Sequence, residues 1–265
     1  MKYILGFIGC GNMGGALVKA AAKAVGGEHI AVCDYDTKKA EKFAVELGVT
    51  ALTASELAAE SKFVVLGVKP QNMQETLAPI QGVLAGNKDV VLITMAAGLS
   101  IAAVQTYAGN AFPTVRIMPN TPAMLGEGMI LYATNGVSKE DETMFLDCFS
   151  KAGKIDKIPE DKIDAASALS GCGPAFVYAF AEALADGAVE CGVPRDKAAL
   201  YAAQTLKGAA EMLLTFGHPG DLKDAVCSPG GTTIAGVHAI ESGSFRGATM
   251  DAVMAAYKRT LELKK

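Results

Sequence analysis

Two short runs in the first half of the chain, residues 63–68 and 90–94, are apolar throughout, and this feature limits the fold more than any other. A strand with one face in water alternates apolar and polar side chains, whereas a strand covered on both faces does not. Ala-rich stretches of helical length separate these runs from two earlier short ones, residues 3–8 and 30–33. Strands that alternate with helices favour a parallel sheet with crossover helices.

The strand pattern continues to about residue 160, and a helical pattern follows. Three runs would complete the sheet, in directions that the sequence leaves open: residues 115–118, 129–132 and 154–158. After about residue 160 helical spacing takes over, and Phe176, Phe180 and Leu184 recur every four residues. Residues 195–216 predict a helix so rich in Ala and Leu that it needs cover on more than one side. A second copy of the chain is one such cover.

Composition excludes several classes of protein. The chain has 265 residues, 51% of them apolar, which suffices for a core and excludes disorder. Its 24 Lys and Arg against 28 Asp and Glu give a formal charge of −4, so no nucleic-acid partner is expected. Six scattered cysteines without a CxxC pair indicate neither a zinc site nor a disulfide framework. No metal is therefore expected, and the thiols are expected to be reduced.

The sequence also bears on location. The N-terminal residues lack the pattern of a signal peptide. The most apolar stretch, residues 90–104, is interrupted by Gly98 and Ser100 and falls short of the roughly 18 residues that a membrane span requires. The prediction is a cytoplasmic protein with no membrane partner.

A glycine motif joins the first predicted strand to a helical segment at residues 15–24. It consists of Gly9, Cys10, Gly11, Asn12, Met13 and Gly14. In dinucleotide-binding folds the first glycine allows a tight turn, the second lets a pyrophosphate approach, and the third lets the helix pack on the strand. A chance match is the alternative, but the position between strand and helix favours a nucleotide site. The predicted fold class is an N-terminal Rossmann-like, doubly wound, mostly parallel α/β sheet, residues 1–160, followed by an all-α C-terminal domain, residues 161–265.

Asp34 lies twenty residues after Gly14, at the end of the second predicted strand. A carboxylate there suits the ribose 2′-hydroxyl of NADH and repels the 2′-phosphate of NADPH. Lys38 and Lys39 follow within a turn, within reach of a phosphate, so Asp34 favours NADH only modestly.

Ligands of open α/β sheets bind beyond the carboxyl ends of the strands, so the residues that follow each strand are expected to gather at one edge. Those residues are Lys69 and Pro70, then Ala96, Ala97 and Gly98, and then Asn120. We expect the Asn120 amide to bind the nicotinamide carboxamide. An exposed lysine and a rigid turn between prolines are the ordinary alternatives for Lys69 and Asn120.

Residues 228–233, Ser-Pro-Gly-Gly-Thr-Thr, form a second constellation. Ile234, Val237 and Glu241 continue at helical spacing, which predicts a loop that runs into a helix N-terminus. Unpaired backbone N–H groups and the helix dipole make such a place a seat for a small carboxylate. From these residues alone, simple helix capping is the more common interpretation.

Five blocks together resemble the pyrroline-5-carboxylate reductase family across essentially the whole chain. They are the glycine motif, Val68-Lys69-Pro70, Met118-Pro119-Asn120-Thr121-Pro122, Leu169-Ser170-Gly171-Cys172-Gly173-Pro174-Ala175, and the run from His218 to Glu241. The last block is the most specific. The resemblance implies the final step of proline biosynthesis, in which NADPH or NADH reduces L-1-pyrroline-5-carboxylate to L-proline by hydride transfer.

The resemblance also implies roles for single residues. Thr233 is the expected catalytic residue, whose hydroxyl hydrogen-bonds the ring nitrogen. The expected substrate-binding residues are Ser228, Gly230, Gly231, Thr232 and Thr233. With the nucleotide motifs, the expected cofactor-binding residues are Gly9, Gly11, Asn12, Met13, Gly14, Asp34, Lys69, Pro70, Ala96, Ala97, Gly98 and Asn120. Residues 161–265 are expected to bind substrate and to join subunits into a homodimer and a higher homo-oligomer, with each substrate between the helical domain of one subunit and the nucleotide domain of another.

Two positions depart from the family pattern. Cys172 stands where family members typically have serine, which weakens one hydrogen bond. Tyr35 stands where many NADPH-preferring relatives have arginine, so Asp34 and Tyr35 both favour NADH modestly, while the family allows NADPH. The alternatives are a 3-hydroxyacid dehydrogenase-type oxidoreductase and a dinucleotide-sensing protein without turnover.

Overall fold

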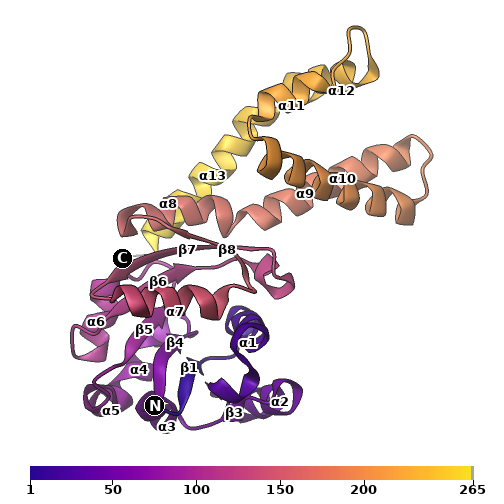
Figure 1. The fold of residues 1–265 in the computed structure, drawn as a ribbon. Coiled ribbons are helices and arrows are strands. Elements are labelled where there is room, and N and C mark those ends of the chain that lie inside the picture. Colours follow the sequence, from indigo (N-terminus) through magenta and orange to yellow (C-terminus); the bar gives the residue numbers. More distant parts are fainter. Residues whose placement is uncertain (264–265) are drawn as a thin grey trace. The chain divides into compact units, whose positions relative to one another are not determined.

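The structure, a computed structural model, describes residues 1–263, which contain an eight-stranded sheet and two groups of helices (Figure 1). The strands are β1 (Tyr3–Ile8), β2 (Ile30–Cys33), β3 (Thr50–Ala51), β4 (Ser61–Leu66), β5 (Val91–Thr94), β6 (Thr114–Met118), β7 (Gly128–Asn135) and β8 (Gly153–Lys157). The first group of helices comprises α1 (Asn12–Val25), α2 (Thr37–Leu47), α3 (Ala54–Glu60), α4 (Met73–Leu77), α5 (Gln81–Gly86), α6 (Ile101–Ala108), α7 (Lys139–Phe149) and α8 (Glu160–Ser170). The second comprises α9 (Gly173–Glu190), α10 (Arg195–Phe216), α11 (Pro219–Ala225), α12 (Thr232–Ser242) and α13 (Phe245–Glu262).

The strands lie in the order β3-β2-β1-β4-β5-β6-β7-β8, and every neighbouring pair is parallel except β6 and β7. The chain therefore moves outward from β1 to β3 and then returns to place β4 on the other side of β1. Every predicted strand is present, and the two-residue β3 is too short to leave a pattern. The predicted fold class, a doubly wound and mostly parallel sheet followed by helices, is confirmed.

Successive residues of the central strands point to opposite faces, and both faces are covered. Phe63 and Val65 of β4 pack in one apolar core with residues of α1, α2 and α7. Val64 and Leu66 pack in a second core with residues of α3, α4, α5 and α6. All four side chains are fully buried, which explains why this run is apolar throughout rather than alternating.

The described residues form two compact units, residues 1–172 with residues 256–263, and residues 173–255. The sequence places a boundary between residues 160 and 161, whereas by its contacts α8 belongs to the sheet unit. Arg116 of β6 and Asp164 of α8 explain this position, because they form a buried ion pair at 2.6 Å. The two units are described separately below.

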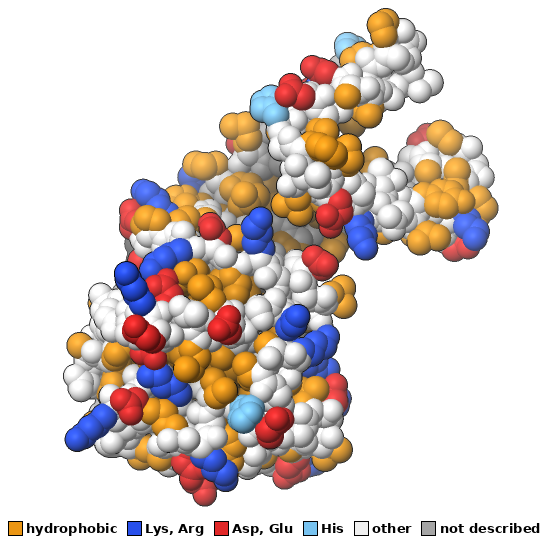
Figure 2. Space-filling model, in the orientation of Figure 1, with side chains coloured by type: hydrophobic (Ala, Val, Ile, Leu, Met, Phe, Trp, Pro, Cys, Tyr) orange, Lys and Arg blue, Asp and Glu red, His pale blue; other side chains and the backbone are white. Residues whose placement is uncertain are grey.

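The helical unit buries little apolar surface within one chain. Its buried core consists of Ala185, Ala198 and Ala202, where α9 packs on α10. Large apolar side chains lie exposed on its helices, as the orange side chains over it in Figure 2 show, and they include Val177, Tyr178, Leu200, Tyr201, Leu214, Phe216 and Met250. By length and composition alone, the helical run from Glu160 to Glu190 is apolar enough to cross a membrane, and 11% of its most apolar window is buried within this chain.

Length and composition therefore single out residues 160–190 rather than residues 90–104, which the sequence analysis takes as the most apolar stretch. The apolar residues of the run are spaced by helical turns and broken by Gly171 and Cys172, so no contiguous stretch draws attention in the sequence. A helix with this much uncovered apolar surface needs a cover, whether lipid or another protein surface.

Candidate active site

The carboxyl ends of β1 and β4 approach each other where the chain changes direction across the sheet. Gly9 directly follows β1 with a φ of 101°, a conformation that glycine adopts without strain. The Gly67 N–H donates to the Ile8 carbonyl at 2.8 Å, and the Gly9 N–H donates to the Cys33 carbonyl at 2.8 Å. The end of β1 is thus bonded on both sides, at the position where open α/β sheets bind their ligands.

Three glycines near this point differ in whether a side chain would fit. A Cβ on Gly14 would collide with the Gly9 carbonyl oxygen, and a Cβ on Gly67 would lie 2.5 Å from the same atom. A Cβ on Gly11 would meet no protein atom within 4 Å. Gly14 and Gly67 are therefore required by packing, whereas Gly11 faces open space in front of α1.

Gly67 was missed by the sequence analysis, which extends the third predicted strand to Val68. The prediction is wrong at that end, because β4 stops at Leu66 and Gly67 passes against Gly9. The predicted helix start at Gly15 is also late, since α1 begins at Asn12 with Gly11 as its N-cap. The first N–H groups of α1 consequently begin within the glycine motif itself, as an anion site requires.

The Asp34 carboxylate, at the end of β2, is tied to the glycine motif. One oxygen accepts the Cys10 N–H at 2.6 Å and the other accepts the Asp36 N–H at 3.0 Å. Each carboxylate oxygen has a second lone pair, so the group can still accept a ribose hydroxyl. Asp34 therefore fixes the shape of the glycine loop as well as supplying a negative charge beside it.

A pocket of about 500 Å³ adjoins Asp34 between β2, α2 and α3. It is lined by Cys33, Asp34, Thr37, Ala40, Glu41, Ala51, Leu52, Thr53, Ala54 and Glu56. Three of these side chains are carboxylates and none is Lys or Arg, so the pocket disfavours a further anion. Tyr35, Lys38 and Lys39 are exposed and do not line it.

The Cys10 thiol lies within the glycine motif but is unreactive at neutral pH. It is 4% exposed, and burial, reinforced by the negative charge of Asp34, raises its pKa to about 12. The reactive form of cysteine is the thiolate, which is therefore scarce here at neutral pH. Its sulfur lies 3.7 Å from the Cys33 carbonyl oxygen and serves packing rather than catalysis.

The loop between β5 and α6 carries three predicted cofactor residues. Ala96 is buried, Ala97 is exposed, and Gly98 has a φ of 79°. The Ala96 N–H donates to the Thr94 hydroxyl at 3.3 Å, which holds the first part of the loop to the end of β5. Lys69 and Pro70 follow β4 at the start of the 3-10 helix η2 (Pro70–Asn72), with the Lys69 side chain exposed.

Asn120 follows β6 and is 9% exposed. Its amide Nδ2 donates to the Ser170 carbonyl at 2.9 Å, and its Oδ1 accepts the Met129 N–H at 2.9 Å. Asn120 thus joins the ends of β6 and α8 to the start of β7. Its contact with a nicotinamide carboxamide stays a prediction. Nδ2 carries two hydrogens, and the second is left to donate to such a ligand.

The second constellation lies in the helical unit, at the start of α12. The predicted loop is two residues too long at its end, because α12 begins at Thr232. A turn precedes it, in which the Gly231 N–H donates to the Ser228 carbonyl at 3.0 Å and Gly230 has a φ of 68°. No side chain caps this helix start, and Ser228, Thr232 and Thr233 are exposed. The first N–H groups of α12 therefore lie uncapped beside three exposed hydroxyl side chains.

Two family models and a curated relative match the chain. The model described as pyrroline-5-carboxylate reductase dimerisation matches residues 160–263, and that described as NADP oxidoreductase coenzyme F420-dependent matches residues 4–98. A pyrroline-5-carboxylate reductase of Pisum sativum is 41% identical over 266 residues, which cover 99% of this chain and 96% of the relative. The chain belongs to the pyrroline-5-carboxylate reductase family.

Solved structures of the pyrroline-5-carboxylate reductase family agree over the full length. The enzyme of Plasmodium falciparum, with NADP bound, is 34% identical with a TM-score of 0.88, and that of Coxiella burnetii is 31% identical with a TM-score of 0.91. Each match covers 100% of both chains. The predicted activity, reduction of pyrroline-5-carboxylate to proline by a nicotinamide dinucleotide, is confirmed, and the dimerisation model supports a homo-oligomer.

Substitution of Gly11 and Gly67 by alanine separates cofactor binding from packing in this reductase. We expect G11A to unfold within about 2 °C of the unchanged protein but to bind NADH at least about tenfold more weakly, because its methyl group occupies open space before α1. We expect G67A to lower the melting temperature by several degrees, because overpacking costs about 1–3 kcal/mol. Thermal unfolding and NADH titration measure both. Unchanged NADH affinity in G11A would contradict this interpretation of the glycine motif.

Proposed function

We propose that this reductase uses NADH in preference to NADPH, that α12 binds the substrate carboxylate, and that Thr233 bonds the ring nitrogen. The observation that carries the proposal is the uncapped start of α12 beside Ser228 and Thr232, in a chain whose sheet unit has a dinucleotide motif and an acidic pocket beside it.

The start of α12 has the chemistry of a carboxylate seat. Backbone N–H groups in the first turn have no partner within the helix, and the helix dipole adds partial positive charge there. The turn at Gly230 and Gly231 leaves these groups uncovered, because neither residue has a side chain. Ser228 and Thr232 supply hydroxyl donors at the same end of the helix.

Thr233 follows Thr232 in the first turn of α12, and it is exposed. When bound, the dinucleotide would supply a hydride to C5 of the pyrroline ring; the electron pair of the C=N bond moves to nitrogen, whose proton either arrives with an iminium substrate or comes from water. A hydroxyl that hydrogen-bonds this nitrogen fixes the ring relative to the hydride donor. Orientation of that kind contributes up to about 7–11 kcal/mol in well-aligned reactions, so a strong acid is not required.

Removal of the Thr233 hydroxyl tests this role. We expect Thr233→Ala to lower kcat/KM for pyrroline-5-carboxylate at least about tenfold, because one engaged, preorganised donor is worth roughly 2.7–4 kcal/mol. NADH affinity should stay within about threefold, and Thr233→Ser, which keeps the hydroxyl, should retain most of the activity. Steady-state kinetics and NADH titration give these values. Equal kcat/KM in the alanine variant and the unchanged enzyme would show that a residue other than Thr233 contacts the ring nitrogen.

The preference for NADH rests on charge. Asp34 ends β2 with a carboxylate, and the adjoining pocket adds Glu41 and Glu56 with no cationic side chain. A ribose with a free 2′-hydroxyl can donate to such a carboxylate, whereas a 2′-phosphate is repelled by it. Tyr35, fully exposed after Asp34, supplies no positive charge in compensation.

The activity assay with both cofactors tests the proposed function as a whole. With pyrroline-5-carboxylate, loss of nicotinamide absorbance and proline formation are expected, with kcat/KM higher for NADH than for NADPH. In Asp34→Ser the ratio of the two kcat/KM values should shift toward NADPH by at least about tenfold. A higher kcat/KM for NADPH in the unchanged enzyme would refute the cofactor preference, and turnover of 3-hydroxyacids alone, or binding without turnover, would refute the activity.

The assembly is proposed to be a homodimer that associates further through the helical unit. The dimerisation model spans residues 160–263, and the helices of this region leave many large apolar side chains exposed. A second copy of the same surface would cover them, as isologous dimers do. The cytoplasmic location follows if protein rather than lipid covers these helices, and it remains part of the proposal.

A charge on this surface tests the assembly. Leu214 of α10 is 73% exposed within one chain, and we expect Leu214→Glu to shift the enzyme toward monomer in sedimentation velocity at micromolar concentration. Val45→Glu, at a residue of α2 that is 90% exposed, is the matched control and should leave the assembly unchanged. A monomeric unchanged enzyme would contradict the proposal.

A further inference from the structure

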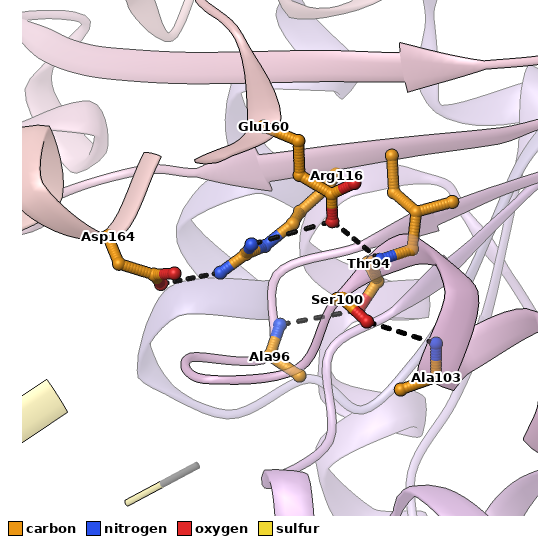
Figure 3. Close-up of polar contacts among 8 residues, drawn as sticks. Thr94, Ala96, Ser100, Ala103, Arg116, Glu160 and Asp164 are labelled. Atoms are coloured by element: carbon orange, nitrogen blue, oxygen red, sulfur yellow. Dashed lines mark hydrogen bonds and ion pairs between the residues drawn. The ribbon is translucent and has the colours of Figure 1, made fainter. Parts of the chain in front are cut away.

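Arg116 is the largest side chain that the sheet unit buries completely, and it lies on β6 with 2% of its surface exposed. Its Nη2 bonds the Asp164 carboxylate at 2.6 Å, and its Nη1 lies 3.6 Å from Glu160 Oε1. Asp164 and Glu160 are four residues apart, on one side of α8. Figure 3 shows the guanidinium between the two carboxylates. A single strand residue therefore holds two positions of the same helix.

The Glu160 carboxylate has a second partner on another element. The same oxygen that faces Arg116 accepts the backbone N–H of Ile101 at 2.7 Å. Ile101 is the first residue of α6, and its N–H has no acceptor within that helix. Ser100 satisfies a different N–H, that of Ala103, at 3.1 Å (Figure 3). Glu160 thus caps α6 from α8, across 59 positions of the sequence.

This cap holds one end of the loop between β5 and α6. The loop is fixed to β5 through the bond from the Ala96 N–H to the Thr94 hydroxyl, and to α8 through Glu160 and Ile101. Between these points lie Ala97, which is exposed, and Gly98, whose φ of 79° shows a sharp turn. Met95, Ala96 and Leu99 anchor the loop in the two apolar cores, and the bond from the Ile101 N–H to Glu160 adds a polar contact at the end of the loop where α6 begins.

We propose that Glu160 is a positioning residue for hydride transfer, acting through the Ile101 N–H on the loop of residues 95–100, and that Arg116 keeps Glu160 in place. The inference rests on the proposed function and on the expected cofactor contact of Ala96, Ala97 and Gly98: β5 lies on the opposite side of β1 from β2 and Asp34, so this loop faces the opposite end of a dinucleotide bound along the carboxyl edge of the sheet. Glu160 is 35% exposed, and without the guanidinium its side chain would be free to turn into water. Arg116 prevents this while its other nitrogen is engaged by Asp164.

The contact between Glu160 and Ile101 lies away from the Asp34 end of the cofactor site. Its loss is therefore expected to change catalysis more than cofactor binding. The pocket beside Asp34, at the other end of the dinucleotide site, involves none of these residues. Loss of the cap should therefore leave most of the cofactor affinity intact while it misplaces the reacting end. A small misplacement at the reacting atoms lowers the rate much more than it lowers binding.

Two substitutions at Glu160 separate the hydrogen bond from the rest of the side chain. Glu160→Ala removes the acceptor, whereas Glu160→Gln keeps an oxygen for the Ile101 N–H and removes only the charge. Arg116 itself is a poor first target, because its removal leaves Asp164 buried without its cation and endangers folding. Lys62→Met is the matched control, since it breaks the half-buried ion pair with Asp141, at 2.8 Å, near the amino end of β4.

The measurements are kcat and KM with NADH and pyrroline-5-carboxylate, the NADH dissociation constant, and the melting temperature. In Glu160→Ala we expect kcat to fall at least about tenfold, with the NADH dissociation constant within about threefold of that of the unchanged enzyme. Glu160→Gln should keep kcat within about threefold, and Lys62→Met should keep it unchanged.

Three results would overturn the inference: an unchanged kcat in Glu160→Ala, equal losses of kcat in the alanine and glutamine variants, or an equal loss in Lys62→Met. The unchanged enzyme serves as the reference in each assay. Its failure to form proline would refute the proposed function instead, so the two failures are distinguishable.

Discussion

The approach of β1 to β4 at their carboxyl ends is the constraint on which the rest of the structure depends. The Gly9 carbonyl lies so close to Gly67 and Gly14 that no side chain fits on either residue. Because these backbones nearly touch, α1 starts immediately beyond β1, and its first N–H groups lie at the edge of the sheet. The Asp34 carboxylate then sets the loop from the other side through the Cys10 N–H.

The two units differ in how much of their apolar surface they bury within one chain. The sheet unit covers both faces of β4 with helices and buries even an arginine, which it neutralises with carboxylates of α8. The helical unit has a core of small side chains and leaves its large ones outside. Hydrophobic burial within one chain therefore stabilises the first unit, whereas the second depends on a further surface.

Features that depend on neighbouring residues could be predicted from the sequence. The strands 63–68 and 90–94 were visible as unbroken apolar runs, and α10 occupies the residues 195–216 that its composition predicts. The glycine motif could be assigned because strand, turn and helix follow one another directly. The family resemblance supplied the activity and the expected role of Thr233, which composition and spacing alone do not reveal.

Features that depend on distant residues could not be predicted. Glu160 and Ile101, or Asn120 and Ser170, are bonded across 59 and 50 positions, and nothing in either local pattern marks a partner. The position of Asn120 after a strand predicts a cofactor contact, which stays a prediction, but it gives no sign that the same amide joins three segments of the protein. The need for glycine at position 67 could not be predicted, because it arises from the carbonyl of Gly9, at the end of another strand.

The exposed apolar side chains of α9 and α10 have a consequence for how the enzyme is made. During synthesis these helices leave the ribosome after all eight strands of the sheet, so the sheet can form while the helices still have no apolar cover. Where a second copy of the chain supplies this cover, as proposed above, the last step of maturation is bimolecular, and its speed depends on the concentration of newly made chains.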